Sequence, residues 1–163
     1  MDYMRNTKAL IFDIRHNAGG GVTKAAGRFV TNEKKIPMYD KYGYADTMRI
    51  VPQGSYIYIN PVVILINGCS VSAAEYISSV LQPLDNIILA GDTTAGMGGE
   101  DFQTELSSGK KVTTARSYSL YKNNLIQWNG IPPDTLIQNT EAEVRQNTDR
   151  QLEFALKYLR SKI

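Results

Sequence analysis

The run "PVVILIN", residues 61–67, constrains the fold more than any other stretch of the sequence. It is apolar, β-branched and continuous, which is typical of a parallel strand buried on both faces. The runs "KALIFDIR" (residues 8–15) and "NIILAG" (residues 86–91) have the same character. Between the runs at residues 61–67 and 86–91, "SAAEYISSVLQPL" (residues 72–84) has helical spacing and ends near Pro83. Strands that alternate with helices predict an α/β domain with a parallel sheet.

The rest of the chain predicts further elements around this sheet. Residues 36–61 are rich in tyrosine and turn residues and indicate an irregular excursion with short strands. Over residues 99–128 the pattern alternates, which predicts antiparallel strands and a hairpin turn at residues 108–110. Apolar residues at helical spacing predict two more helices, one over 22–31 with Val22, Ala25, Ala26 and Phe29 on its inner face, and one over 140–163 with Leu152, Ala155, Leu156 and Leu159.

The composition excludes several function classes. The chain has 163 residues and a net charge of +2, and its basic residues are scattered, so we expect no nucleic-acid partner. A single cysteine, Cys69, and a single histidine, His16, are too few for the usual zinc motifs, so we expect no metal. Cys69 ends a buried strand and is interpreted as a small core residue. No run suits a membrane span, and the start "MDYMRNTK" lacks the pattern of a signal peptide.

The glycine run "HNAGGGVTK" follows the first predicted strand and precedes a helix, where backbone amides can bind an anion. A dinucleotide fingerprint counted from Gly19 needs a glycine at position 24, which is Lys24, and no GK[ST] closes a phosphate loop. We therefore expect no nucleotide and no other cofactor. Two interpretations of the glycine run stay open: a tight turn, or a pocket of backbone amides that binds an oxyanion.

Three serine patterns are candidates for a nucleophile. Ser70 takes the serine place of a GxSxG elbow that lacks its second glycine. An SxxK spacing occurs twice over residues 107–111, but at the predicted hairpin turn rather than at a helix start. Ser72 begins a helix, where the helix dipole and free amides favour an oxyanion. Ser72 and Glu75 are also spaced as a capping box, which satisfies the same amides without any catalysis.

The chain resembles the catalytic core of the C-terminal processing, or tail-specific, serine proteases and their tricorn-like relatives in four runs that occur in order: "KALIFDIRHNAGGG", "PVVILINGCSVSAAEYISSVLQPL", "IILAGDTTAGMGG" and "WNGIPPDTLI". The resemblance covers nearly the whole chain. It implies an α/β fold with a crotonase-like β-β-α spiral core, an antiparallel hairpin and a C-terminal helix. It also implies that Ser72 is the nucleophile and that the backbone amides of Gly19, Gly20 and Ala73 form the oxyanion hole.

The sequence departs from the family pattern at two positions that would activate the serine. The serine and lysine type carries a lysine base in a G-x-T-x-G-K-G run, and Met97 stands at that place. The tricorn-like branch, to which the chain is closer, takes a histidine from well upstream of the glycine run and a glutamate from near Gln127. A methionine cannot take a proton, and glutamine can only hydrogen-bond. His16 is interpreted as a turn residue, with a role as base left open.

We therefore expect residues 1–163 to form one catalytic-core domain of a serine-type endopeptidase, a fragment that lacks upstream parts of its parent protein. The base would come from outside this chain, so the fragment alone should be inactive or very slow. Its partner would be a peptide or protein substrate. Its oligomeric state stays open, and the resemblance implies an extracytoplasmic site. The alternative is a catalytically inactive peptide-binding module on the same fold, and an acyl-CoA enzyme is a third option. Asp13 and Arg15 are predicted to pair at the sheet edge.

Overall fold

The structure, a computed structural model, describes residues 2–21 and 23–163. At its centre is a four-stranded parallel sheet with the strand order β1-β4-β5-β10. Its strands are β1 (Leu10–Asp13), β4 (Val62–Ile66), β5 (Ile87–Gly91) and β10 (Thr135–Leu136). The three apolar runs of the sequence are the first three of these strands, so the predicted parallel sheet is confirmed.

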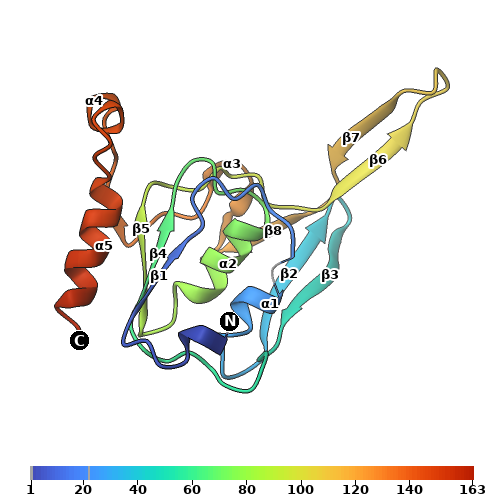
Figure 1. Ribbon diagram of the computed structural model, residues 1–163. Helices are drawn as coiled ribbons and strands as arrows, with labels where there is room; N and C mark the ends of the chain where they lie inside the picture. Colours follow the sequence, from blue (N-terminus) through green and yellow to red (C-terminus); the bar gives the residue numbers. More distant parts are fainter. Residues whose placement is uncertain (1, 22) are drawn as a thin grey trace.

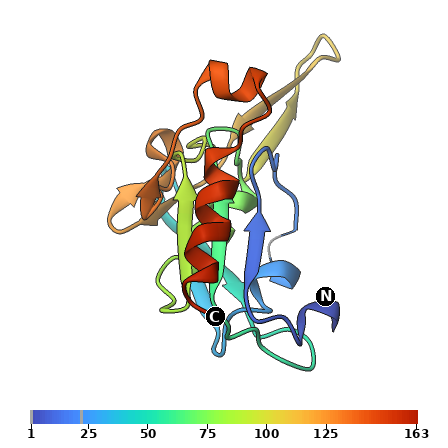
Figure 2. The ribbon, with the colours of Figure 1, turned by 60° about the vertical axis from the view of Figure 1, so that its left-hand side comes forward.

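Strand β4 lies between two packed layers, and all five of its residues are buried. Val62, Ile64 and Ile66 join the larger core cluster, which includes the helix α2 (Ala73–Leu81). Val63 and Leu65 join a smaller cluster with Ala155 and Leu159 of the helix α5 (Arg150–Arg160). Figure 2 shows α5 lying across the outer face of the parallel sheet. A strand covered on both faces needs apolar residues at every position, which explains the unbroken run.

A second, antiparallel sheet covers the other side of α2 (Figure 1). Its strand order is β3-β2-β8-β9, with β2 (Lys34–Asp40), β3 (Gly43–Ile50), β8 (Tyr118–Tyr121) and β9 (Asn124–Leu125). Residues 36–61 were predicted as an irregular excursion with short strands, but β2 and β3 form a hairpin of seven and eight residues with a register shift between Met38 and Tyr39. In β2, Ile36 and Met38 alternate inward onto the core, which is the period of a half-buried strand.

Helix α2 is buried on nearly all sides because it lies between the two sheets. The predicted inner-face residues Ala73, Ile77, Val80 and Leu81 are buried, and Tyr76 and Ser78, which flank that face, are buried as well. The predicted hairpin is also confirmed. Strands β6 (Asp101–Glu105) and β7 (Lys111–Ala115) pair with each other alone and extend away from the body (Figure 1).

The first predicted helix is shorter than expected. This helix, α1, covers only Thr23–Ala26 and follows β1, which is preceded by the 3-10 turn η1 (Asp2–Met4). Val22 lies outside the described residues. Ala26 and Phe29 are buried as predicted. Gly27 follows directly after α1, and a glycine inside a helix costs about 1 kcal/mol relative to alanine, which favours an end at this point.

The C-terminal helix was predicted as continuous, and this was wrong. It is broken into α4 (Glu141–Arg145) and α5 by a turn in which Asn147 has a φ of 55°. The predicted inner residues Leu152 and Leu156 are 37% and 41% exposed. Arg15, which follows β1, binds Asp149 and Gln151 at the start of α5. These bonds orient the helix so that Gln151, Ala155 and Leu159 face the sheet.

A short irregular turn, α3 (Ile126–Asn129), connects β9 to the segment that leads to β10. Across residues 2–21 and 23–163, none of the helices combines the length and the apolar character that crossing a bilayer requires.

Candidate active site

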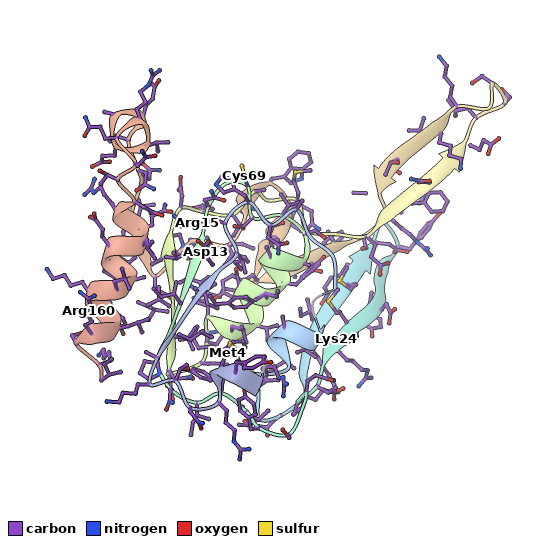
Figure 3. The ribbon with its side chains drawn as sticks, viewed as in Figure 1. Met4, Asp13, Arg15, Lys24, Cys69 and Arg160 are labelled. Carbon is purple, nitrogen blue, oxygen red and sulfur yellow. The ribbon has the colours of Figure 1, made fainter. Side chains whose placement is uncertain are left out.

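The site lies where β1, β4 and β5 end, because parallel strands deliver their following loops to one edge of the sheet. Figure 3 shows Asp13, Arg15 and Cys69 at this end. The glycine loop after β1 binds the loop after β4, since the Val71 N–H donates to the Asn17 carbonyl at 2.8 Å. The loop after β5 joins them, since the Ala95 N–H donates to the Ser70 carbonyl at 3.0 Å.

Ser72 is the N-cap of α2 and has a strained backbone, with φ 52° and ψ −108°. A non-glycine residue in that region costs of the order of 1–3 kcal/mol and is a feature of functional sites. Ser72 and Glu75 face each other as a capping box, yet the Ser72 hydroxyl accepts no hydrogen bond of regular geometry at the helix start. Gly19 lies against it: a Cβ added at Gly19 would stand 3.0 Å from the Ser72 Cβ and 3.3 Å from its Oγ. The glycine loop therefore approaches the serine as closely as a glycine permits.

Glu75 holds the site together from beneath. Its side chain is fully buried, and its carboxylate accepts hydrogen bonds from the Ser72 N–H (3.1 Å), the Thr94 hydroxyl (2.8 Å), the Gly96 N–H (2.7 Å) and the Met97 N–H (2.9 Å). These four bonds join the start of α2 to the loop after β5 through one side chain.

Thr94 extends this network to the late run "GIPPD". Its hydroxyl accepts from the Ile131 N–H at 2.7 Å, and its own N–H donates to the Ile131 carbonyl at 3.2 Å. Sequence reasoning assigned Glu75 only to helix capping and gave Thr94 no role. The signal that could have found them was the cluster of hydroxyl residues "DTTAG" directly after a buried strand.

The three predicted oxyanion donors differ in their hydrogen bonds. The Gly19 N–H donates to the Asn17 side-chain oxygen at 2.8 Å. The N–H groups of Gly20 and Ala73 have no acceptor among the described residues. Two of the three predicted donors are therefore open, and they come from the two loops that meet at Ser72.

Met97 and Gln127 occupy the two positions where the family pattern places activating groups. The Met97 N–H binds Glu75, so its backbone lies beside that of Ser72, while its side chain is 64% exposed. The Gln127 amide oxygen accepts from the Ser119 N–H at 3.1 Å, and its nitrogen donates to the carbonyl of Gly98. Gln127 therefore ties the antiparallel sheet to the glycine-rich loop after β5.

His16 and Cys69 both contact Asn67, a residue that sequence reasoning passed over. The Asn67 side-chain oxygen accepts from the N–H groups of His16 (3.1 Å) and Cys69 (3.0 Å), and its nitrogen lies 3.1 Å from His16 Nε2. The prediction that Cys69 is a core residue was wrong, because β4 ends at Ile66 and Cys69 lies exposed in the following turn. Within the described part of the chain, no group of three or more histidine, cysteine or carboxylate side chains is placed to hold a metal ion.

Two other serine candidates have structural positions. Ser70 is fully buried, and its hydroxyl donates to the Ile14 carbonyl at 2.9 Å while it accepts from the Asn67 N–H at 3.1 Å. The SxxK pairs of residues 107–111 lie exposed at the tip of the β6–β7 hairpin. Neither arrangement presents an activated hydroxyl to the loops around Ser72.

The predicted pair of Asp13 and Arg15 is confirmed, with 2.7 Å between the guanidinium and the carboxylate. Arg15 also binds Asp149 at 2.8 Å. The hydrogen bond to Asp13 raises the pKa of Arg15, against the effect of its partial burial. This cluster fixes α5 to the end of β1 and thereby supports the strand that carries the glycine loop.

Known proteins resemble this chain in sequence and in fold. The sequence matches the family model of peptidase family S41 over residues 1–137. It is 28% identical over 151 residues to the chloroplastic carboxyl-terminal-processing peptidase 3 of Arabidopsis thaliana, covering 86% of this chain and 29% of that protein. It is 30% identical over 118 residues to the carboxy-terminal processing protease CtpA of Bacillus subtilis, covering 69% of this chain and 25% of that protein.

Among solved structures, a protein from Parabacteroides merdae thought to be a peptidase superposes with a TM-score of 0.81 at 28% identity, covering 97% of this chain and 55% of that one. The fold and the matched relatives define the class, which is that of the serine-type proteases. The chain belongs to peptidase family S41. It spans 29% and 25% of the length of the two curated relatives described above.

Proposed function

We propose that this chain is the catalytic core of a serine-type endopeptidase of the tail-specific or tricorn-like kind, with Ser72 as the nucleophile. The observation that carries the proposal is the strained backbone of Ser72 at the helix start, where its hydroxyl lies in a capping-box arrangement with Glu75 but accepts no regular cap hydrogen bond. Strain at this residue is consistent with selection for reactivity rather than for stability. The layering of strands and α2 fits a crotonase-like spiral, which we include in the proposal.

In this proposal the Ser72 oxygen attacks a peptide carbonyl, and the carbonyl oxygen becomes an alkoxide. The N–H groups of Gly20 and Ala73 are open to bind that oxygen, and the α2 dipole adds to their effect. Gly19 would contribute its N–H once the bond to Asn17 is released. Glu75 acts as a positioning residue, because it fixes the Ser72 backbone against the Met97 loop.

The general base belongs to a part of the protein outside this chain. Among residues 2–21 and 23–163, no hydrogen bond joins the Ser72 hydroxyl to a histidine, a lysine or a carboxylate. His16 is hydrogen-bonded to Asn67 instead. The chain alone is therefore expected to hydrolyse peptides very slowly or not at all. The resemblance supports an extracytoplasmic site for the parent protein and a peptide or protein as its substrate.

A fluorophosphonate probe, which reacts with activated serine hydroxyls, tests the assignment in the parent protein. Labelling should be lost in Ser72→Ala and kept in Ser107→Ala, a matched control on the exposed hairpin tip. Labelling that survives Ser72→Ala would exclude Ser72 as the nucleophile. The isolated chain should label much more slowly than the parent protein.

The second candidate is a catalytically inactive peptide-binding module on the same fold. It is favoured by Met97, which stands where the family carries a lysine, and by Gln127, whose amide is used to connect two segments. A parent protein that binds peptides but is neither labelled by the probe nor active on any of them would favour this module over the enzyme.

A further inference from the structure

Trp128 is the only tryptophan of the chain, and it is 91% exposed beside the candidate site. Its φ of 75° lies in the left-handed region, which is strained for a residue of this size. The backbone N–H of Trp128 donates to the Gly96 carbonyl at 2.9 Å, and a Cβ added at Gly96 would stand 2.9 Å from the Trp128 backbone. Met97, which follows Gly96, donates its backbone N–H to the same Glu75 carboxylate as Ser72 does. The backbone of Trp128 is thus held against the loop that also binds Glu75 and Ser72, and its large aromatic side chain is exposed to solvent.

Three hollows meet at Ala115 and form one groove around Trp128 and the base of the β6–β7 hairpin. The first has a volume of about 290 Å³ and runs between Met97, Trp128 and Ala115. The second, of about 450 Å³, is also lined by Trp128 and Ala115 and reaches Lys41 and Arg116. The third, of about 540 Å³, continues from Ala115 to Phe102 and Tyr42. We call the three together the Trp128 groove.

The charge of the lining side chains differs between the first hollow, which is the inner end of the Trp128 groove, and the second and third hollows, which are its outer end. The first hollow is lined by no charged side chain, only by glycine, methionine, threonine, alanine, glutamine and tryptophan residues. The second and third are lined by both Lys41 and Arg116, which are exposed. Neither cation forms a salt bridge within the described part of the chain. They lie over aromatic rings instead, Lys41 over Tyr42 at 4.8 Å and Arg116 over Phe102 at 5.9 Å.

Asp40 is the one acidic residue that lines the third hollow, and it forms no salt bridge with Lys41 or Arg116 in the described part of the chain. Its carboxylate accepts from the Tyr42 N–H at 2.7 Å, as a turn residue does. The outer end of the groove therefore carries two cations that are open to an anion from solution. An arginine next to an aromatic ring is also a typical binding hot spot.

We propose that the Trp128 groove binds the substrate on one side of the scissile bond, and that an acidic side chain of the substrate is recognised by Lys41 and Arg116. An uncharged side chain would occupy the hollow between Met97 and Trp128, nearer to Ser72. This selection for an acidic residue rests on the proposed peptidase function, and it adds a charge requirement to it. Charge complementarity selects the occupant, because two cations next to an uncharged hollow suit a peptide with one acid better than a polyanion.

Tryptophan fluorescence of the Ser72→Ala chain tests the inference without any need for catalysis, since Trp128 is the only indole present. The probes are peptides of equal length that contain no tryptophan, with an apolar central segment and a single glutamate moved along the sequence. Each peptide has a partner with glutamine in place of the glutamate. Binding should shift the Trp128 emission to the blue, and glutamate at one position should lower Kd about fivefold relative to glutamine.

Two variants assign the charge preference to the proposed residues. Arg116→Gln and Lys41→Gln should each reduce the preference for glutamate, and the double variant should abolish it, as should high salt. The matched control is Lys110→Gln, an exposed lysine at the hairpin tip that lines none of the three hollows. The inference is overturned if no peptide moves the Trp128 emission, if glutamate and glutamine bind equally at every position, or if the preference survives in the double variant.

These outcomes are separate from those of the nucleophile test. Loss of probe labelling in Ser72→Ala together with equal binding of glutamate and glutamine peptides would refute the acid recognition alone. A glutamate preference that disappears in the double variant supports the groove even if a different serine proves to be the nucleophile.

Discussion

The pattern S/T-x-x-E opens two helices of this chain, α2 and α4, and the structure uses it in two different ways. At α4 the capping box is complete: the Glu143 N–H donates to the Thr140 hydroxyl at 3.3 Å, and the Thr140 N–H donates to the Glu143 carboxylate at 2.8 Å. At α2 the Ser72 N–H donates to Glu75 and the two side chains face each other as a capping box, but the Ser72 hydroxyl accepts no hydrogen bond of regular geometry. The same local signal therefore yields an ordinary helix start at α4 and a strained one in the candidate site.

The two glutamates explain the difference. Glu143 is partly exposed and binds within its own helix start and at Arg150. Glu75 is fully buried, and the loop after β5 supplies three of its four donors, from Thr94, Gly96 and Met97. A carboxylate shared with a second loop holds the backbone of the helix start in place, so the serine hydroxyl is no longer needed as a cap.

The largest effect that separates the two boxes should come from Glu75→Gln. The replacement keeps the shape, but its amide nitrogen would face N–H donors where the carboxylate accepted them, and buried donors would lose their partners. We expect a loss of about 3 kcal/mol in the free energy of unfolding, measured by urea denaturation. Glu143→Gln, the matched change at α4, should cost far less. Equal losses at the two positions would contradict the distinction between the boxes.

The sequence was sufficient to predict the parts of this arrangement that depend on local pattern. The buried strand β4, the helix after it and the serine at its start follow from continuous apolar residues and from a capping signal. The burial of Glu75 and its bonds to Thr94 could not be predicted, because they depend on loops that are distant in sequence and meet only at the sheet edge. The break before Asp149 was missed for the same reason, since Arg15 of another segment fixes that helix start.

Thr94→Val tests whether the second loop is what distinguishes the α2 box. Valine keeps the size of threonine but removes the hydroxyl that donates to Glu75 and accepts from the Ile131 N–H. The Ile131 N–H would then be buried without a partner, so we expect a loss of about 1–3 kcal/mol in the free energy of unfolding. Thr114→Val, on the exposed strand β7, is the control and should be close to neutral. A neutral Thr94→Val would show that Glu75 does not depend on this loop.

Glycine at the two N-caps should act in opposite directions. Ser72 has a φ of 52°, so Ser72→Gly relieves strain and should raise the free energy of unfolding by about 1 kcal/mol, while it removes the proposed nucleophile. Thr140 has an ordinary φ of −75°, so Thr140→Gly loses a cap and should lower stability by about 0.5 kcal/mol. Thermal unfolding of both variants measures the sign. Destabilisation by Ser72→Gly would mean that the serine start is not strained in solution.

The smallest effect is the pH dependence of the complete box at α4. Hydrogen bonds from Thr140 lower the pKa of Glu143 below its ordinary value, and the charge of Arg150 adds to this. A carboxyl group whose pKa is lowered by folding adds stability above its unfolded pKa, and this contribution is lost as the pH falls through the folded pKa. The difference in unfolding free energy between wild type and Glu143→Gln should therefore be present at about pH 6 and decrease progressively as the pH falls below about 4.3, the ordinary pKa of a glutamate. If the difference is unchanged at low pH, the Glu143 charge does not contribute to this helix start, and the α4 box is held by Thr140 alone.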